Sequence, residues 1–119
     1  MKRFLLIDGD RAAMQKLGLA CLERDVAVSM ADNVCEGVRI LLSSPVSLIV
    51  VDASRMRLTP GEHATLFDRV APGVPVVVVI NPDAELETLV AYEVAGFTVK
   101  TRPLAAEDLL DKAAAVELR

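Results

Sequence analysis

Short apolar runs alternate with amphipathic segments along the whole chain. Five apolar runs, each bounded by turn-forming or charged residues, predict short buried strands: Phe4–Ile7, Val26–Met30, Leu48–Val51, Val76–Ile80 and Phe97–Val99. The segments after these runs repeat apolar residues at helical spacing and predict helices over Ala12–Arg24, Asn33–Ser43, Pro60–Val70, Ala84–Ala95 and Ala106–Glu117. The chain therefore repeats a strand and a helix five times.

This alternation predicts the α/β class, with a parallel sheet covered by helices on both faces. Right-handed crossovers leave few topologies, and the common order for five such strands is 2-1-3-4-5. We therefore expect a flavodoxin-like (βα)5 fold, a doubly wound parallel five-stranded sheet. The 119 residues suit a single domain over residues 1–119.

Composition narrows the class of protein. Hydrophobic residues make up 53% of the chain, which can bury a real core. The net charge of −4 comes without a basic stripe, so we expect no direct nucleic-acid partner. No apolar run reaches the length of a membrane span, and the first run is too short for a signal peptide, so we expect a cytoplasmic protein without membrane contact. Cys21 and Cys35 lie in helical segments, which favours buried free thiols.

Three carboxylates follow strands that meet in this fold. Ligands bind open parallel sheets at the carboxyl ends of the strands, where the winding direction reverses, here between the first and third strands. Asp8 and Asp10 follow the first strand, and Asp52 ends the third. Such carboxylates repel one another unless a cation joins them, and oxygen ligands favour Mg²⁺. Asp8, Asp10 and Asp52 are thus candidate metal ligands, and Asp8 or Asp52 could accept a phosphoryl group.

Four segments, in order, resemble the receiver domain of bacterial two-component response regulators: LLIDGD, LIVVD, PVVVVINP and AGFTVKTRPL. The resemblance covers the whole chain and implies that Asp52 is the phosphoacceptor and Asp8 the first acid of an acidic pair. Gly9 stands where the family has the second acid, which binds Mg²⁺ directly. Asp10 is one residue later, and either a metal ligand or an N-cap of the first helix is open to it.

This chain also departs from the receiver pattern at the residues that, in the family, change conformation on phosphorylation. Ile80 falls at the position of the switch Thr or Ser and has lost the hydroxyl, while Val99 stands in place of the strand-5 aromatic residue. Arg102 replaces the Lys before Pro103, and we expect a salt bridge from Arg102 to Asp52 and a cis Arg102–Pro103 bond. A ligand without differential contacts shifts no equilibrium, so phosphorylation-driven switching should be weak or absent. Mg²⁺ binding should likewise be weak or absent.

We therefore expect an atypical, degenerate receiver that is not an enzyme and signals mainly through protein–protein contacts. The resemblance implies a sensor histidine kinase or another signalling protein as partner. It also implies a possible homodimer through the fourth helix, the fifth strand and the fifth helix. The one histidine, His63, lies at a helix start and is expected to face water.

Two other classes remain open. Asp8-Gly9-Asp10 also resembles the first motif of Mg²⁺-dependent haloacid-dehalogenase-like phosphatases, in which Asp8 would be the nucleophile and Asp10 the general acid. Against that class, Arg11 and Ala12 follow the motif in place of its usual Thr or Val, and no later acidic pair is placed to hold the metal. Flavin or nucleotide binding is disfavoured, because no Gly-rich phosphate loop follows the first strand.

Overall fold

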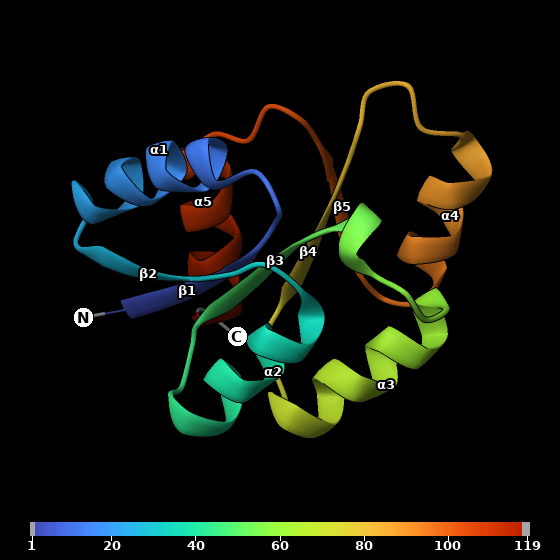
Figure 1. Ribbon diagram of the computed structural model, residues 1–119, viewed down its shortest axis with the longest axis horizontal. Helices are drawn as coiled ribbons and strands as arrows, with labels where there is room; N and C mark the ends of the chain where they lie inside the picture. Colours follow the sequence, from blue (N-terminus) through green and yellow to red (C-terminus); the bar gives the residue numbers. More distant parts are fainter. Residues whose placement is uncertain (1, 118–119) are drawn as a thin grey trace.

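The computed structural model describes residues 2–117 and contains the predicted five-stranded parallel sheet in the order β2-β1-β3-β4-β5. The strands are β1 (Lys2–Ile7), β2 (Val26–Ala31), β3 (Leu48–Asp52), β4 (Val76–Ile80) and β5 (Thr98–Thr101). The helices are α1 (Arg11–Leu22), α2 (Val34–Ser43), α3 (Pro60–Val70), α4 (Leu86–Val94) and α5 (Ala106–Glu117), with a short 3-10 helix, η1 (Ala53–Arg55), after β3. Figure 1 shows the helices on both sides of the twisted sheet.

Both faces of the sheet are buried, which explains why the strand runs are continuously apolar. In β1, Leu5 and Ile7 point into a core shared with α2, α3 and α4, whereas Phe4 and Leu6 point into the core under α1 and α5. All four of these side chains are at most 2% exposed. The sheet thus separates two apolar layers, and its polar groups are left at the strand ends.

Local signals set the ends of several helices. Asn33 caps α2 by accepting a hydrogen bond from the Glu36 amide at 2.9 Å. Thr59 and Glu62 form a capping box at the start of α3, followed by Pro60 at the first helical position. Gly96, with φ of 103°, ends α4 in the left-handed region that glycine tolerates.

Some predicted bounds differ from the structure. α4 begins at Leu86 rather than Ala84, because the Ala84 amide closes a turn onto the Asn81 carbonyl. β5 covers Thr98–Thr101 rather than 97–99, since it pairs with β4 along Val77–Ile80. Cys21 is buried as expected, but Cys35 is exposed, because it lies on the outer side of α2. Among the described residues, no helix has the length and apolar character needed to cross a bilayer.

Candidate functional site

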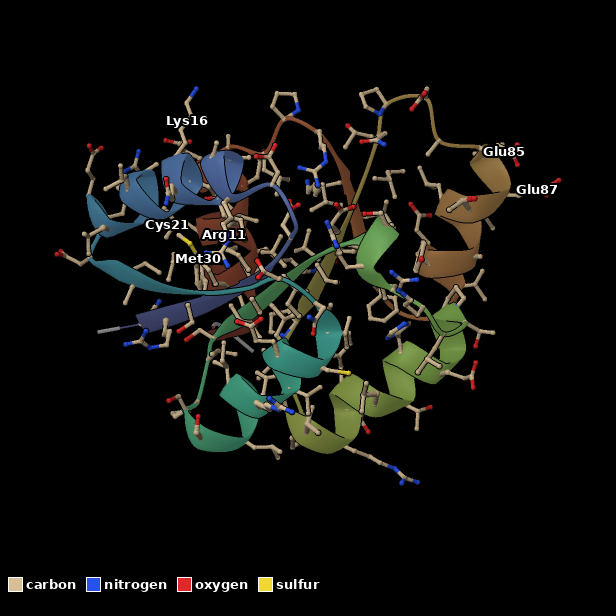
Figure 2. The ribbon with its side chains drawn as sticks, in the orientation of Figure 1. Arg11, Lys16, Cys21, Met30, Glu85 and Glu87 are labelled. Carbon is tan, nitrogen blue, oxygen red and sulfur yellow. The ribbon has the colours of Figure 1, made fainter. Side chains whose placement is uncertain are left out.

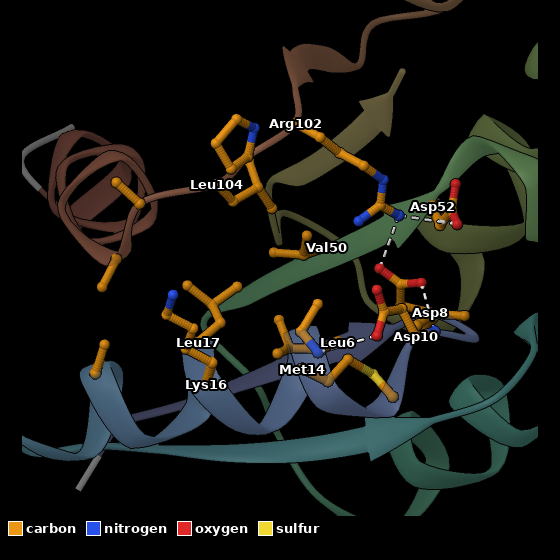
Figure 3. A pocket seen from close by; sticks show the side chains of 16 residues that line it. Leu6, Asp8, Asp10, Met14, Lys16, Leu17, Val50, Asp52, Arg102 and Leu104 are labelled. Atoms are coloured by element: carbon orange, nitrogen blue, oxygen red, sulfur yellow. Dashed lines mark hydrogen bonds and ion pairs between the residues drawn. The ribbon is translucent and has the colours of Figure 1, made fainter. Parts of the chain in front are cut away.

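Three strands deliver charged side chains to one edge of the sheet. Asp8 directly follows β1, Asp52 is the last residue of β3, and Arg102 directly follows β5. β1 and β3 are neighbours in the sheet, so the two carboxylates meet at the point where the winding direction reverses. Figure 3 shows Arg102 reaching across this edge to both carboxylates.

A single guanidinium nitrogen bridges the pair. Arg102 Nη2 lies 2.8 Å from Asp8 Oδ2 and 2.9 Å from Asp52 Oδ2. The side chains of Arg102, Asp8 and Asp52 are 26%, 15% and 18% exposed, so water screens this triad only in part. Burial alone lowers the pKa of the guanidinium, but hydrogen bonds and charges from Asp8 and Asp52 outweigh it and raise the pKa above its usual value. Arg102 is therefore a permanent cation between the two acids.

Backbone amides and the Ser54 hydroxyl also bind the two carboxylates. The Ser54 amide donates to Asp52 Oδ1 at 3.1 Å, and the Ser54 hydroxyl donates to Asp52 Oδ2 at 2.9 Å. The Asp10 amide donates to Asp8 Oδ1 at 3.0 Å. Each oxygen of Asp8 and Asp52 thus accepts at least one hydrogen bond, which holds both carboxylates in fixed orientations.

The backbone around Arg102 matches the expectation from the sequence. The Arg102–Pro103 bond is cis, as predicted. The Arg102 amide donates to the Ile80 carbonyl at 3.1 Å and so continues the pairing of β5 with β4. The expected salt bridge between Arg102 and Asp52 is present, and Asp8 joins it.

Gly9 has a second arginine against it. A Cβ at position 9 would overlap the Nη2 and Cζ atoms of Arg55, which follows Asp52 in η1. The Arg55 guanidinium therefore occupies the space that a side chain at position 9 would need. Arg55 Nε is buried and has no hydrogen-bond partner among the described residues. The sequence after Asp52 predicts a charged loop beside the site that includes Arg55, but it does not predict the contact of Arg55 with Gly9.

Asp10 lies outside the triad. Its Oδ1 accepts a hydrogen bond from the Ala13 amide at 3.0 Å and caps α1, which is one of the two roles expected for it. Residues 2–117 contain no group of three or more His, Cys, Asp or Glu side chains that could hold a metal ion. The metal-ligand role of Asp10 remains a prediction.

The donor set fits Mg²⁺ poorly. Mg²⁺ takes carboxylate oxygens and keeps several waters in near-octahedral geometry. Here Arg102 already offsets one of the two negative charges of Asp8 and Asp52, Gly9 offers no side-chain oxygen, and Arg55 brings a second positive charge to that place. The residues present therefore do not match the donor set that Mg²⁺ prefers.

The predicted switch positions lie beside the triad. Ile80 ends β4, is 4% exposed and packs in the core shared with α2, α3 and α4. Val99 is half-buried on β5 and packs against the same core. Lys100 and Asn81 are exposed. An apolar contact thus stands at the end of β4, where the resemblance implies a hydroxyl.

His63 does not face water, so that expectation was wrong. The side chain is 2% exposed and stacks beside Phe67, with ring centroids 6.2 Å apart. Its Nε2 accepts a hydrogen bond from the Leu58 amide at 3.0 Å, while Nδ1 is buried without a partner among the described residues. Burial lowers the pKa of His63, with a smaller opposing effect from Glu62. His63 ties the loop before α3 to the core.

Comparisons with known proteins agree with this geometry. No protein-family model matches the chain. The chain is 27% identical over 103 residues to two transcriptional regulatory proteins, GlrR of Escherichia coli strain K12 and QseF of Escherichia coli O157:H7. The match covers 84% of this chain but only 22% of either regulator, so the chain spans about a fifth of the length of the curated relatives it matches.

Several solved receivers of response regulators share this fold. A two-component response regulator from Clostridium difficile aligns with a TM-score of 0.82 at 22% identity, over 100% of this chain and 98% of its own. A CheY-like receiver domain from Methanospirillum hungatei JF-1 gives 0.82 at 23%, over 99% and 98%. A Burkholderia pseudomallei response regulator, solved with a phosphorylated aspartic acid, a calcium ion and citrate, gives 0.79 at 21%, over 99% and 72%. The chain has the CheY-like receiver fold of response regulators, and the phosphatase alternative is not favoured.

Proposed function

We propose that this chain is an atypical receiver domain of two-component signal transduction, which works as a protein-docking module with weak or no phosphorylation-driven switching. The receiver fold and the sequence match to two transcriptional regulators support the family. The observation that carries the atypical part is the Arg102 nitrogen that holds Asp8 and Asp52 together. A site in which an arginine already bridges both acids is stable without a phosphoryl group.

This arrangement opposes phosphoryl transfer to Asp52. Phosphoryl transfer depends on positioning and on neutralising the negative charge that gathers around the transferred group, usually with a metal ion. Both oxygens of Asp52 accept hydrogen bonds, and Arg102 stabilises the free carboxylate before any transfer begins. Stabilising the ground state as well as the transition state gives no acceleration. Asp52 is intact, but its environment favours the unmodified form.

The end of β4 would respond weakly even to a phosphorylated Asp52. The Ile80 side chain has no donor to offer a phosphoryl oxygen and is already packed in the core. Val99 packs against the same core. A phosphoryl group would then make few contacts that differ between two conformations, and only such differential contacts can shift an equilibrium. We infer one dominant conformation of the α4–β5 face.

That face offers a surface for a partner. Leu86, Val90 and Val94 recur every four residues along α4 and are 72%, 44% and 81% exposed. Figure 2 shows Glu85 and Glu87 extending outward at the start of the same helix. Exposed apolar stripes with a polar rim mark interaction sites. The proposed occupants are a second copy, through α4, β5 and α5, or another signalling protein such as a sensor histidine kinase.

A second copy is the first occupant to test. In a two-fold dimer each residue of the patch meets the same patch of the partner, so acids of α4 can face exposed Lys100 of β5. Sedimentation velocity over a range of concentrations should show self-association that Val90→Asp abolishes. Leu19→Asp on exposed α1 is the matched control and should leave association unchanged.

Switching is tested separately, by amide NMR spectra with and without Mg²⁺ and acetyl phosphate. We expect the resonances of α4 and β5 to keep their positions. Large shifts over this face that vanish in Asp52→Ala would show a working switch and contradict the proposal. A monomer at every concentration would remove the homodimer and leave a different signalling protein as the occupant.

A further inference from the structure

Gly9 stands between Asp8 and Asp10 at the end of β1, and its backbone does not require a glycine. Its φ angle lies outside the left-handed region that favours this residue. The three atoms nearest to a Cβ at position 9 all belong to one side chain, that of Arg55, and are its Nη2, Cζ and Nε. The missing side chain at position 9 therefore makes room for the Arg55 guanidinium rather than for an unusual turn.

The turn after β3 carries Arg55 to this place. Asp52 ends β3 and caps η1 by accepting a hydrogen bond from the Ser54 amide, and Arg55 is the last residue of η1. β1 and β3 are neighbours in the sheet, with Ile7 opposite Val51, so a long side chain from η1 reaches the end of β1. The Arg55 Nε atom is buried there and has no hydrogen-bond partner among residues 2–117. What Arg55 brings to the site is therefore its charge.

The charges of the acid pair are balanced without a metal ion. Asp8 and Asp52 bring two negative charges, and Arg102 and Arg55 bring two positive ones. The carboxylate of Asp10 caps α1, where the positive end of the helix dipole favours an acid. The resemblance to receivers implies a second acid at position 9 and a divalent cation beside it. In this chain a glycine replaces that acid, and an arginine side chain lies in the space that it leaves.

We propose that Arg55 is a tethered cation that takes the place of the divalent metal at this edge of the sheet and excludes metal ions from it. A divalent ion beside Asp8 and Asp52 would be repelled by a guanidinium that the chain itself holds there. Gly9 and Arg55 act as a pair, because the guanidinium overlaps any side chain at position 9. This inference rests on the receiver fold of the proposed function and adds a residue that determines metal specificity.

The test uses Mn²⁺ as the probe, because it takes the same oxygen ligands as Mg²⁺ and broadens the NMR signals of nearby amides. Titration followed at the amides of residues 8–10 and 52–55 gives the affinity at this edge. Arg55→Ala should bind Mn²⁺ at least about tenfold more tightly than the wild type, because it removes a cation beside two acids. Arg57→Ala removes the same charge from an exposed side chain of the segment after β3 and should leave the affinity unchanged.

Gly9→Ala tests the contact without changing any charge. Its Cβ should push the Arg55 guanidinium away from position 9, so the affinity for Mn²⁺ should rise about threefold or more. In the Arg55→Ala background the same substitution should add nothing, because no guanidinium is left to displace. Gly61→Ala is the matched control, since a Cβ at position 61 would meet nothing within 4 Å.

Three results would overturn the proposal. The first is equal affinity for Mn²⁺ in the wild type and Arg55→Ala. The second is an equal rise in Arg55→Ala and Arg57→Ala, which would indicate a general effect of net charge. The third is a rise in Gly9→Ala that persists in full in the Arg55→Ala background, because the glycine would then act through something other than Arg55.

Failure of this inference is distinguishable from failure of the proposed function. Tight Mn²⁺ binding by a wild type that stays unphosphorylated would reject Arg55 as a tethered cation and leave the docking function standing. Phosphorylation of Asp52 by acetyl phosphate in the presence of EDTA, lost in Arg55→Ala, would contradict the proposed function and support the role of Arg55.

Discussion

Replacing Arg102 by Gln removes the cation that bridges Asp8 and Asp52 and leaves two carboxylates facing each other. A hydrogen bond to a charged group contributes about 1.5–3 kcal/mol, and breaking a fully buried ion pair costs about 3–5 kcal/mol. The three side chains are 26%, 15% and 18% exposed, so water screens the loss in part. We expect Arg102→Gln to lower the free energy of unfolding by about 2–3 kcal/mol.

The chain contains a matched control for this measurement. Arg11 Nη2 lies 2.8 Å from Asp32 Oδ2, the same distance as Arg102 Nη2 from Asp8 Oδ2, but the Arg11 and Asp32 side chains are 71% and 44% exposed. Exposed pairs contribute about 0–1 kcal/mol, so Arg11→Gln should cost less than about 1 kcal/mol. Urea unfolding at neutral pH, with the slope compared between variants, gives both values.

Like-charge repulsion supplies a second check on the same reasoning. In the Arg102→Gln background, Asp52→Asn should recover part of the lost stability, because it removes one of the two facing charges. In the wild type the same substitution should destabilise, because Arg102 loses a partner. An Arg102→Gln variant that loses no more stability than Arg11→Gln would refute the view that the triad holds this edge of the sheet together.

Three further predictions concern other parts of the molecule. Burial lowers the pKa of His63 in the folded state, so as the pH falls the unfolded chain binds a proton on this side chain first. The free energy of unfolding should therefore keep its full contribution from His63 above about pH 6.5 and decrease below that pH. Urea unfolding should show a smaller decrease in His63→Gln. Thr59→Ala should cost about 1 kcal/mol by thermal or urea unfolding, since it removes the α3 capping box. Millimolar Mg²⁺ should raise the Tm of the double variant Gly9→Asp/Arg55→Ala, because that variant gains an acid and loses a cation at the site. The Tm of the wild type should stay unchanged. Equal shifts in Tm for both proteins would contradict the inference that the wild-type residues fit Mg²⁺ poorly.

Periodicity was sufficient for the architecture because the sheet is buried on both faces. Runs such as Leu48–Val51 are apolar throughout, without the alternation of apolar and polar residues that is typical of a half-exposed strand. The even spacing of these runs, with helices between them, leaves few topologies. The positions of Asp8 and Asp52 at strand ends followed from that topology, and so did their meeting at one edge. Caps such as Asn33 were predictable because they depend on neighbours in sequence.

Contacts between distant segments could not be predicted in the same way. Arg55 lies against Gly9 because a long side chain in η1 reaches across the strand ends, a path that no local pattern encodes. His63 was expected at the surface because it lies at a helix start, but its Nε2 accepts a hydrogen bond from the Leu58 amide and its ring packs beside Phe67. Arg102 was expected to pair with Asp52, whereas its second bond to Asp8 depends on how close β1 and β3 place the two carboxylates.

The intact mass of the protein after incubation with Mg²⁺ and acetyl phosphate shows whether Asp52 accepts a phosphoryl group. Asp52→Ala is the control, and a receiver known to accept phosphate shows that the conditions work. We expect little or no added phosphoryl mass on the wild type, because Arg102 pairs with Asp52 and stabilises its unmodified carboxylate. Stoichiometric phosphorylation that disappears in Asp52→Ala would contradict it and would show a live phosphoacceptor despite Arg102 and Gly9.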